Sequence, residues 1–495
     1  RLVDVQVHIT PGLVAFNIVG LPDKAVGESR ERVRSALYAS GLSLPAKRIT
    51  VNLAPADLPK EGSHFDLPIA LGLMAAMGAI PEDAINNHVV LGELALDGSI
   101  TAVTGVLPAA VAANAHDKSL ICPHVCGPEA AWAGDEMDIL AAPNLIALVN
   151  HFQGTQVLSK PKPAVHQRDA MLPDLRDVRG QESARRALEV AAAGGHNMLM
   201  SGPPGAGKSM LASRLPSILP ALSAQELLEI SMIASIAGEL ADGALSSARP
   251  FRSPHHSASM PSLVGGGLRA KPGEVSLAHH GVLFLDELPE FQPSVLDALR
   301  QPLETGEAII TRANYRVAYP AKFQLVAAMN PCRCGHFGEP GYACRRGKNC
   351  DTEYQSRISG PFLDRMDLFI DVPAVSASDM LTARARESSA DVLTRVEAAR
   401  QRQIARYANL GLKNIRLNTH APQNILEEVC AFDSDSQKLL YEAAEKMHLS
   451  ARGLTRVMRV ARTLADLEES ETASKLHLAE ALSYRLHQDS RRRAA

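Results

Sequence analysis

The residues with the clearest chemistry form a glycine-rich run that ends in a lysine and a serine. The run fits the pattern G-x-x-x-x-G-K-[S/T], follows the apolar segment 198–200 and precedes the helix-compatible segment 210–215. Strand, glycine-rich loop and helix in this order predict a phosphate site, because backbone N–H groups and a helix N-terminus attract anions. Lys208 is expected to reach the β- and γ-phosphates, and the Ser209 hydroxyl to coordinate Mg²⁺. The predicted nucleotide loop consists of Gly202, Pro203, Pro204, Gly205, Ala206, Gly207, Lys208 and Ser209.

Two acidic residues, Asp286 and Glu287, follow the apolar segment 281–285 further along the chain. Asp286 is expected to join the Mg²⁺ shell, which is the part of an aspartate after a strand in P-loop NTPases. Glu287 is then placed to polarise the attacking water. An Asp-Glu pair alone marks only the end of a strand, but together with the upstream glycine-rich loop it indicates ATP hydrolysis.

A group of cysteines predicts a structural metal site. Four thiolates in one short loop suit tetrahedral Zn²⁺, although the first pair is separated by one residue and common zinc fingers have two to four. Free thiols, or His336 in place of one cysteine, are the alternatives, and a disulfide is not expected in a reducing cytoplasm. The histidine pairs 255–256 and 279–280 are interpreted as hydrogen-bonded and not as metal ligands. Neighbouring side chains on a strand point to opposite faces, so neither pair alone chelates an ion well. The predicted zinc ligands are Cys332, Cys334, Cys344 and Cys350.

Length and composition indicate a globular protein of several domains. The chain has 495 residues, too many for one core, with 46% hydrophobic and 21% charged residues. The net charge of −3 means that any nucleic-acid binding must come from local basic surface. The longest apolar run, 67–80, is shorter than the about 20 residues that span a bilayer and predicts a buried helix. With no signal peptide recognised, we expect a cytoplasmic protein without membrane contact.

The chain divides into four predicted segments. Residues 1–153 mix strand-like and helix-like stretches, and 154–170 carry prolines and polar residues typical of a linker. In 171–375 strands alternate with helices, which predicts an α/β fold with a parallel sheet covered on both faces. This segment contains the cysteine-rich loop 332–350. The pattern from 376 to 495 is helical.

Within the first segment, three local patterns are clear. Residues 3–9 alternate apolar and polar side chains and 48–53 are rich in β-branched residues, so both predict strands. Residues 92–100 predict a hairpin that turns at Asp97-Gly98.

With these motifs placed, the chain resembles an AAA+ ATPase of the magnesium-chelatase branch, of the ComM/YifB type, a family of DNA branch-migration helicases. The resemblance covers nearly the whole chain and implies an AAA+ P-loop parallel sheet with a C-terminal helical lid. It also implies rings, usually hexamers. Besides the two phosphate motifs, the stretches that carry it are 51–62, 180–182, 250–256, 265–267, 327–332 and 359–367.

The resemblance also assigns roles to residues outside the phosphate motifs. Asn330 is implied as the polar residue at a strand end that positions water and senses the γ-phosphate. Arg365 is implied as an arginine finger that reaches the neighbouring subunit's γ-phosphate, and the alternative is an ion pair with Asp364 or Asp367. Arg452 is implied as the second sensor on the lid. Two further arginines share its helix and remain alternatives for this role: Arg456 and Arg459.

The N-terminal segment resembles the α+β Lon-protease-like fold, of the type of the second domain of ribosomal protein S5. Lon proteases carry a Lys-Asp-Gly-Pro-Ser-Ala-Gly-like motif, and here residues 60–66 read Lys-Glu-Gly-Ser-His-Phe-Asp. His64 stands where the nucleophilic serine would be, and 105–109 offer no lysine. We therefore interpret this domain as protease-dead and expect it to serve ring assembly or DNA contact.

Two segments are candidates for contact with DNA. Residues 306–323 read as two short strands around a tip, and in related helicases such a hairpin enters the pore. Its arginines would meet phosphates and its tyrosine could stack on a base, whereas the alternative is a surface hairpin with solvated arginines. A glycine-rich stretch would let backbone N–H groups approach a strand closely. The candidate residues are Arg312, Asn314, Tyr315 and Arg316 in the hairpin and Gly265, Gly266 and Gly267 in the glycine-rich stretch.

These observations favour an ATP-dependent hexameric motor that moves single-stranded or branched DNA and promotes branch migration in natural transformation. Its expected cofactors are ATP, Mg²⁺ and a structural Zn²⁺. One alternative is the AAA+ motor subunit of a metal chelatase, and another is a scaffold whose assembly ATP controls. Turnover that DNA stimulates would separate the motor from both.

Overall fold

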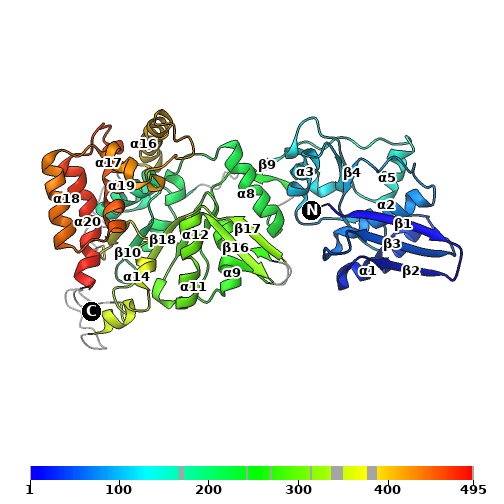
Figure 1. Ribbon diagram of the computed structural model, residues 1–495, viewed down its shortest axis with the longest axis horizontal. Helices are drawn as coiled ribbons and strands as arrows, with labels where there is room; N and C mark the ends of the chain where they lie inside the picture. Colours follow the sequence, from blue (N-terminus) through cyan, green and yellow to red (C-terminus); the bar gives the residue numbers. More distant parts are fainter. Residues whose placement is uncertain are drawn as a thin grey trace. The chain divides into compact units, whose positions relative to one another are not determined.

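The structure is a computed structural model that describes residues 2–166, 172–240, 243–267, 270–312, 315–335, 349–375 and 387–492. The chain folds into two compact units, each of which is built from two stretches of sequence (Figure 1). The N-terminal unit comprises Arg1–Arg168 and Ala224–Ser247, and the second unit comprises Asp169–Ser223 and Ala248–Ala495. The sequence-based boundaries differ from this division, because they placed 224–247 within the ATPase core.

The first half of the N-terminal unit is a three-stranded sheet that two helices cover. In the order β1-β3-β2, β1 runs antiparallel and β2 parallel to the central strand. The strands predicted at 3–9 and 48–53 are confirmed as β1 and β3. The buried helix predicted at 67–80 is confirmed as α2, which ends at Ala76 and so covers the first part of that range. The elements are β1 (Asp4–Thr10), β2 (Ala15–Val19), α1 (Lys24–Ala39), β3 (Arg48–Ala54) and α2 (Asp66–Ala76).

The second half of this unit has a parallel sheet in the order β4-β7-β8 and the predicted Asp-Gly hairpin, β5–β6. Asp97 Oδ1 accepts a hydrogen bond from the Ser99 amide at 2.9 Å, which stabilises that turn. The elements are β4 (His88–Val90), β5 (Glu93–Leu94), β6 (Ile100–Thr101), α3 (Val106–Asn114), β7 (Ser119–Pro123), α4 (Gly127–Ala130), β8 (Ile139–Ala142) and α5 (Leu145–Phe152).

The later stretch of sequence completes the N-terminal unit. Helix α8 (Ala224–Ala237) packs on α3, and β11 (Leu245–Ser246) pairs in parallel with β9 (Val165–His166). Ser235 Oγ donates a hydrogen bond of 2.8 Å to Glu129, a buried carboxyl whose pKa is raised by burial. The Gly105 amide donates to the Ser235 carbonyl at 3.0 Å. Because a buried carboxyl needs a partner, α8 is part of this unit's structure.

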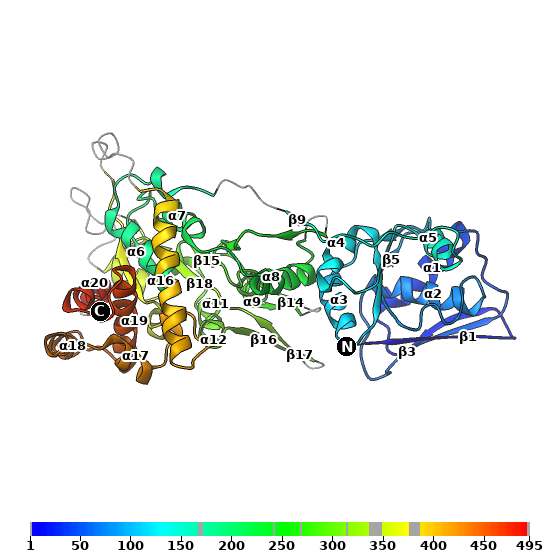
Figure 2. The same cartoon turned by 90° about the horizontal axis from the view of Figure 1, so that it is seen from above.

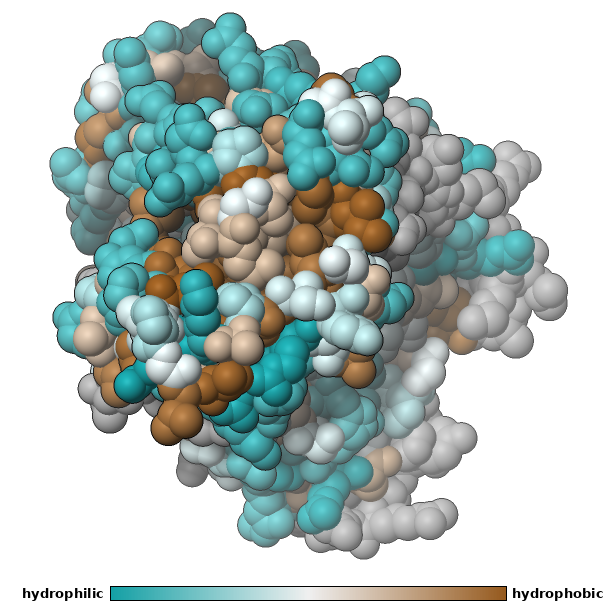
Figure 3. Space-filling view, turned by 90° about the vertical axis from the view of Figure 1, so that its right-hand side faces the viewer, coloured by the Kyte–Doolittle hydropathy of each residue, from teal (hydrophilic) through white to brown (hydrophobic). Residues whose placement is uncertain are grey.

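Apolar and hydrophilic residues alternate in patches on the face of the N-terminal unit shown in Figure 3, with apolar residues near its middle. The exposed apolar side chains of this unit include Leu13, Val14 and Tyr38.

The second unit is built on a five-stranded sheet in the order β12-β15-β18-β10-β19. Every neighbouring pair in it is parallel, so the predicted α/β fold is confirmed. The side chains of β10 alternate between two cores, with Met198 and Met200 in one and Leu199 in the other. The strands are β10 (Met198–Ser201), β12 (Phe251–Arg252), β15 (Val282–Leu285), β18 (Gln324–Met329) and β19 (Leu368–Asp371).

Short helices and two hairpins surround this sheet. The helices are α6 (Glu182–Gly194), α7 (Lys208–Ala212), α9 (Met260–Val264), α10 (Glu274–Leu277), α11 (Pro293–Ala298), α12 (Arg300–Thr305), α13 (Cys350–Gln355) and α14 (Gly360–Leu363). The hairpins are β13 (Gly265–Gly266) with β14 (Lys271–Pro272), and β16 (Glu307–Arg312) with β17 (Tyr315–Pro320).

The C-terminal part of the second unit is helical, as the sequence predicts. Helix α19 packs against α16, α17 and α20, and also against α6 of the sheet layer, so the helices and the sheet share one core (Figure 2). Among the described residues, none of the helices combines the length and apolar character that a membrane crossing needs. The helices are α16 (Ser389–Asn409), α17 (Gln423–Cys430), α18 (Ser434–Lys446), α19 (Ala451–Leu467) and α20 (Lys475–Arg492).

Candidate active site

The glycine-rich loop connects β10 to α7, so the predicted order of strand, loop and helix is present. Gly205 and Gly207 have φ values of +76° and +89°, in the left-handed region that favours glycine. Gly202 has no room for a side chain, since a Cβ there would lie 2.1 Å from the Val372 carbonyl oxygen. The start of the loop therefore packs tightly against the residue that follows β19.

Lys208 lies at the centre of the candidate site. Its side chain is largely buried, and Nζ donates to the carbonyls of Gly202 and Pro203 at 2.7 and 2.9 Å. Nζ also donates to Oδ1 of Asn330 at 3.1 Å, so the structure brings two of the predicted site residues together. Burial lowers the pKa of Lys208, and the charges of Asp286 and Glu287 oppose this shift. The two acids thus help to keep the lysine charged beside the loop.

The predicted magnesium ligands are also neighbours. Ser209 Oγ donates to Oδ2 of Asp286 at 2.7 Å, across a sequence separation of 77 residues. The contact forms because β10 and β15 both lie beside β18 and end at the same edge of the sheet. A hydroxyl and a carboxylate are the hard oxygen ligands that suit Mg²⁺, so these two residues fit the ion that the sequence predicts.

Glu287 adopts a backbone conformation that is rare for a residue with a side chain. Its φ is +51°, which costs roughly 1–2 kcal/mol, and its amide donates to Oδ1 of Asp286 at 2.9 Å. The side chain is half exposed, and Oε2 lies 3.4 Å from Nδ1 of His256. Strain of this kind clusters at functional sites, where the surrounding structure holds a side chain in position.

Sequence reasoning missed the contact of His256 with Glu287, because the histidine pair was interpreted only as hydrogen-bonded. Nδ1 of His255 does form a hydrogen bond with Oγ of Ser257, at 2.8 Å. His256, in contrast, lies beside the carboxylate of Glu287, the predicted catalytic residue. The available signal was its position shortly after β12, the strand that pairs with β15.

Arg365 is buried, and its guanidinium donates to Glu304 at 2.7 Å. Glu304 lies on α12 and is more than half exposed, so this ion pair reaches the surface of the unit. Among the described contacts, the partner of this guanidinium is thus Glu304 and not Asp364 or Asp367, the intrachain partners that the sequence suggests. The Arg365 carbonyl accepts hydrogen bonds from Asn197 and Arg456, at 3.1 and 3.2 Å.

Asp367 joins the sheet to the helical lid. It is fully buried, pairs with the guanidinium of Arg456 on α19, and accepts from the Asn197 amide at 3.0 Å. Nδ1 of His196 lies 3.7 Å from the carboxylate. Burial works to raise the pKa of Asp367, but Arg456, His196 and the Asn197 amide outweigh it and hold this pKa well below its usual value.

An Asp367→Ala change should therefore lower the free energy of unfolding by about 3 kcal/mol at pH 7, because it leaves a partly buried guanidinium unpaired. A lowered folded pKa means that the contribution is complete above the unfolded value of about 3.9 and fades as pH falls below it. Urea denaturation at pH 7 and again below pH 4 measures both effects. Asp435→Ala, at a largely exposed carboxylate 3.9 Å from Lys438, is the matched control. An equal loss at the two pH values would contradict the assignment.

The three arginines considered as second sensor differ in their surroundings. Arg452 is exposed at the start of α19, whereas Arg456 is engaged with Asp367. Arg459 donates to the Ala421 carbonyl at 2.7 Å within the lid. Arg452 thus has the most accessible side chain of the three.

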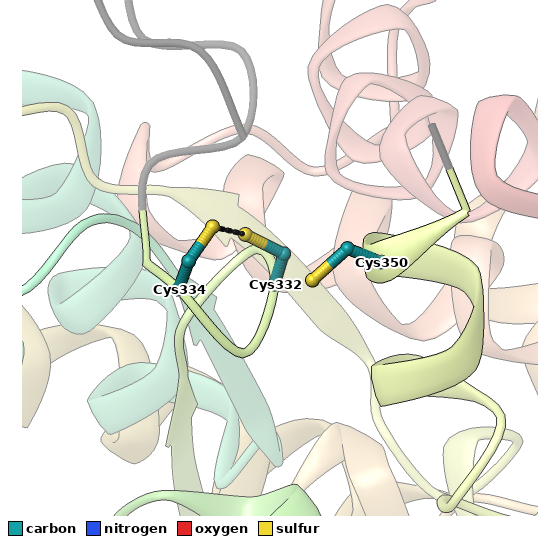
Figure 4. A group of neighbouring side chains, drawn as sticks. All are labelled: Cys332, Cys334 and Cys350. Atoms are coloured by element: carbon teal, nitrogen blue, oxygen red, sulfur yellow. Dashed lines mark hydrogen bonds between the residues drawn. The ribbon is translucent and has the colours of Figure 1, made fainter. Parts of the chain in front are cut away.

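Three of the four predicted zinc ligands gather in one place. Their sulfur atoms all lie within 4.8 Å of one another, and those of Cys332 and Cys334 are 3.0 Å apart (Figure 4). Cys332 and Cys334 lie in the turn after β18, and Cys350 begins α13. Cys344 and His336 lie outside the described residues. Sulfur atoms brought together from two segments fit a thiophilic ion such as Zn²⁺. The described cysteines are all free of disulfides.

The two candidate DNA segments are adjacent. Gly265 lies against the hairpin, since a Cβ there would meet Ile310 Cδ1 at 2.8 Å, and Tyr319 donates to the Ala270 carbonyl at 3.0 Å. Arg316 is exposed on β17, and Lys271 on β14 is an exposed cation that sequence reasoning missed. Gly266 pairs with Lys271, and Gly267 follows. Asn314 lies outside the described residues, as do the side chains of Arg312 and Tyr315.

In the N-terminal unit, residues of and near the segment 60–66, which the resemblance compares with a Lon-protease motif, have structural partners. Asp66 is buried and pairs with Arg32 at 2.6 Å, and buried Lys60 donates to the Pro55 carbonyl. Burial lowers the pKa of His64, which favours the neutral form of this imidazole. The absence of protease activity stays a prediction.

Comparisons with known proteins give a consistent result along the chain. Family models described as magnesium chelatase, subunit ChlI, as subunit ChlI of Mg-chelatase, and as its C-terminal region match residues 174–380, 5–125 and 386–485. The competence protein ComM of Haemophilus influenzae is 44% identical over 490 residues, which cover 98% of this chain and 94% of that protein. YifB of Escherichia coli is 43% identical over 484 residues, with the same coverage. The magnesium-chelatase 38 kDa subunit of Rhodobacter capsulatus is 25% identical over 352 residues, 63% of this chain and 87% of that subunit.

Proposed function

The chain belongs to the ComM/YifB family of magnesium-chelatase-like AAA+ proteins, and from this premise we propose that it is an ATP-driven DNA motor working as a hexameric ring. ATP hydrolysis moves single-stranded or branched DNA through the ring and promotes branch migration of recombination intermediates. The name of the H. influenzae relative, a competence protein, supports natural transformation as the process. A protein with these substrates works in the cytoplasm.

The observation that supports ATP hydrolysis in this proposal is the cluster of Lys208, Asn330, Ser209 and Asp286 at the ends of adjacent parallel strands. Ser209 and Asp286 would hold Mg²⁺, which neutralises charge on the transferred phosphoryl group. Lys208 exchanges its carbonyl partners for the phosphates of ATP. Glu287, half exposed beside Asp286, takes a proton from the attacking water.

The remaining roles follow the family pattern. Asn330 reports the γ-phosphate to Lys208, with which it is already in contact. Arg365 releases Glu304 and reaches the ATP of the neighbouring subunit, and exposed Arg452 acts from the lid. In the ring, the hairpin β16–β17 and the glycine-rich stretch contact DNA together, because they already pack on each other.

The thiol cluster is proposed to bind one structural Zn²⁺. Cys332 and Cys350 are buried and Cys334 is partly buried, and their sulfur atoms lie close enough together to share one ion. Thiolates are soft ligands, and they favour zinc over Mg²⁺. The ion would hold the turn after β18 to the start of α13.

The function is tested by steady-state ATP hydrolysis with no DNA, with single-stranded DNA and with a four-way junction. We expect DNA to stimulate turnover on the order of tenfold, which corresponds to a barrier lowered by about 1.4 kcal/mol. The double change Arg312→Ala and Arg316→Ala should abolish this stimulation and leave the basal rate within about twofold, because it removes phosphate contacts outside the ATP site.

The control for lost charge is Lys438→Ala with Lys446→Ala, two exposed lysines on α18. This variant should keep the stimulation. Hydrolysis that is indifferent to every DNA would contradict the motor and favour the chelatase or scaffold alternatives.

A further inference from the structure

The thiol cluster and the phosphate loop are in direct contact through one glycine. Gly335 follows Cys334 with a φ of +89°, and a Cβ on it would lie 2.7 Å from both Cγ and Cδ of Pro204. Pro204 belongs to the phosphate loop. The turn that carries Cys332 and Cys334 therefore packs against the loop so closely that a side chain at 335 would separate them.

A second connection runs through the residues before the cysteines. Cys332 follows Pro331 and Asn330, and Asn330 accepts from Nζ of Lys208 at 3.1 Å. Nε2 of Gln355 donates to the Pro331 carbonyl at 2.8 Å. Gln355 ends the helix α13 that Cys350 begins, so one short helix supplies both a thiol and the hydrogen bond beside Asn330.

We infer that a zinc ion held by Cys332, Cys334 and Cys350 keeps the phosphate loop in its nucleotide-binding shape, with Gly335 and Asn330 as positioning residues. This inference rests on the proposed function only in that the loop binds ATP, and no DNA step enters it. It assigns the ion a role in the affinity for nucleotide.

The physical reason is that the ion joins two segments that lie apart in the sequence. Cys332 and Cys334 come from the turn after β18, and Cys350 comes from α13. Binding to one ion fixes both segments and thereby the positions of Gly335 and Pro331. Without the ion the turn gains freedom, and the support of Pro204 and of the Asn330–Lys208 hydrogen bond is lost. Nucleotide binding must then order this turn again, and the conformational entropy lost in doing so lowers the affinity for nucleotide.

The test compares zinc content with affinity for a fluorescent ATP analogue, using the full chain in a reducing buffer and no DNA. Cys350→Ser should lose zinc and bind the analogue about tenfold more weakly, a difference of about 1.4 kcal/mol. Gly335→Ala should bind the analogue about as weakly. Because coupling is reciprocal, loss of zinc from this variant also counts in favour. Cys126→Ser is the matched control, since Cys126 is a buried cysteine of the N-terminal unit whose sulfur donates to Val103.

A second measurement keeps the inference testable if Cys350→Ser does not fold. Zinc is removed from the unaltered chain with a chelator that does not bind Mg²⁺ and is then added back, and the affinity should fall and recover. Three results would overturn the inference: no zinc in the unaltered protein, unchanged affinity in zinc-free protein, or unchanged affinity in Gly335→Ala. Failure of DNA stimulation would overturn the proposed motor and leave this inference standing.

Discussion

Glu287→Gln should bind ATP with nearly unchanged affinity and hydrolyse it at least about 10²-fold more slowly. An amide has the shape of the carboxyl group but cannot accept a proton from water. The side chain is half exposed and its backbone is held by the hydrogen bond to Asp286, so the exchange should leave the fold intact. Single-turnover hydrolysis, measured together with equilibrium binding of ATP, separates the lost chemistry from lost affinity.

Glu290→Gln is the matched control for this result. Glu290 lies in the same segment, 3.2 Å from Arg357, and is not part of the proposed chemistry. This variant should keep hydrolysis within about twofold, as expected for a partly exposed ion pair. Ordinary turnover by Glu287→Gln would remove Glu287 from the mechanism and direct attention to another base.

Arg365→Ala should reduce hydrolysis by about 10³-fold or more, because a guanidinium at the γ-phosphate stabilises charge in the transition state. If Arg365 acts across a subunit boundary, a mixture of Arg365→Ala with Lys208→Ala should regain activity. In mixed rings some boundaries combine an intact Lys208 loop with an intact Arg365 from the next subunit. Steady-state hydrolysis at several mixing ratios measures this recovery.

The ion pair with Glu304 supplies the control for Arg365. Glu304→Gln removes the charge that holds Arg365 within its own chain, and hydrolysis should stay at or above the unaltered rate. If Arg365 only stabilises its own subunit, Glu304→Gln should instead lose activity, as Arg365→Ala does. The mixture of Arg365→Ala with Lys208→Ala should then stay inactive. The two readings therefore predict opposite results.

The sequence predicts the phosphate site well because its pattern encodes backbone requirements. Gly205 and Gly207 have the positive φ values that favour glycine, and Lys208 with Ser209 must begin a helix to point at phosphate. The parallel strands bring Ser209 to Asp286 because all of them end at one edge. The thiol cluster could be predicted for a different reason, since Cys332, Cys334 and Cys350 lie close together in the sequence. The roles of these residues stay predictions.

Contacts between distant segments could not be predicted in the same way. The Arg365–Glu304 pair spans 61 residues, and no local pattern selects Glu304 over the neighbouring Asp364 and Asp367. The contact of His256 with Glu287 depends on how two adjacent strands end. Residues 224–237 form a helix of the N-terminal unit, and no local sequence pattern selects the core that this helix joins.

The excursion of residues 224–247 into the N-terminal unit has a consequence for how this gene can be divided. The polypeptide passes from one unit to the other after residues 168, 223 and 247. A single cut in the linker therefore leaves neither fragment with one complete unit alone. A fragment that ends at residue 168 lacks the serine that satisfies the buried Glu129 and the strand that pairs with β9. A fragment that starts after residue 168 keeps helix α8 without α3, the helix on which it packs. A deletion, fusion or exchange of the N-terminal unit would thus have to include residues 224–247 together with residues 1–168. Since residues 224–247 lie within the sequence of the second unit, neither unit is easily gained or lost without the other.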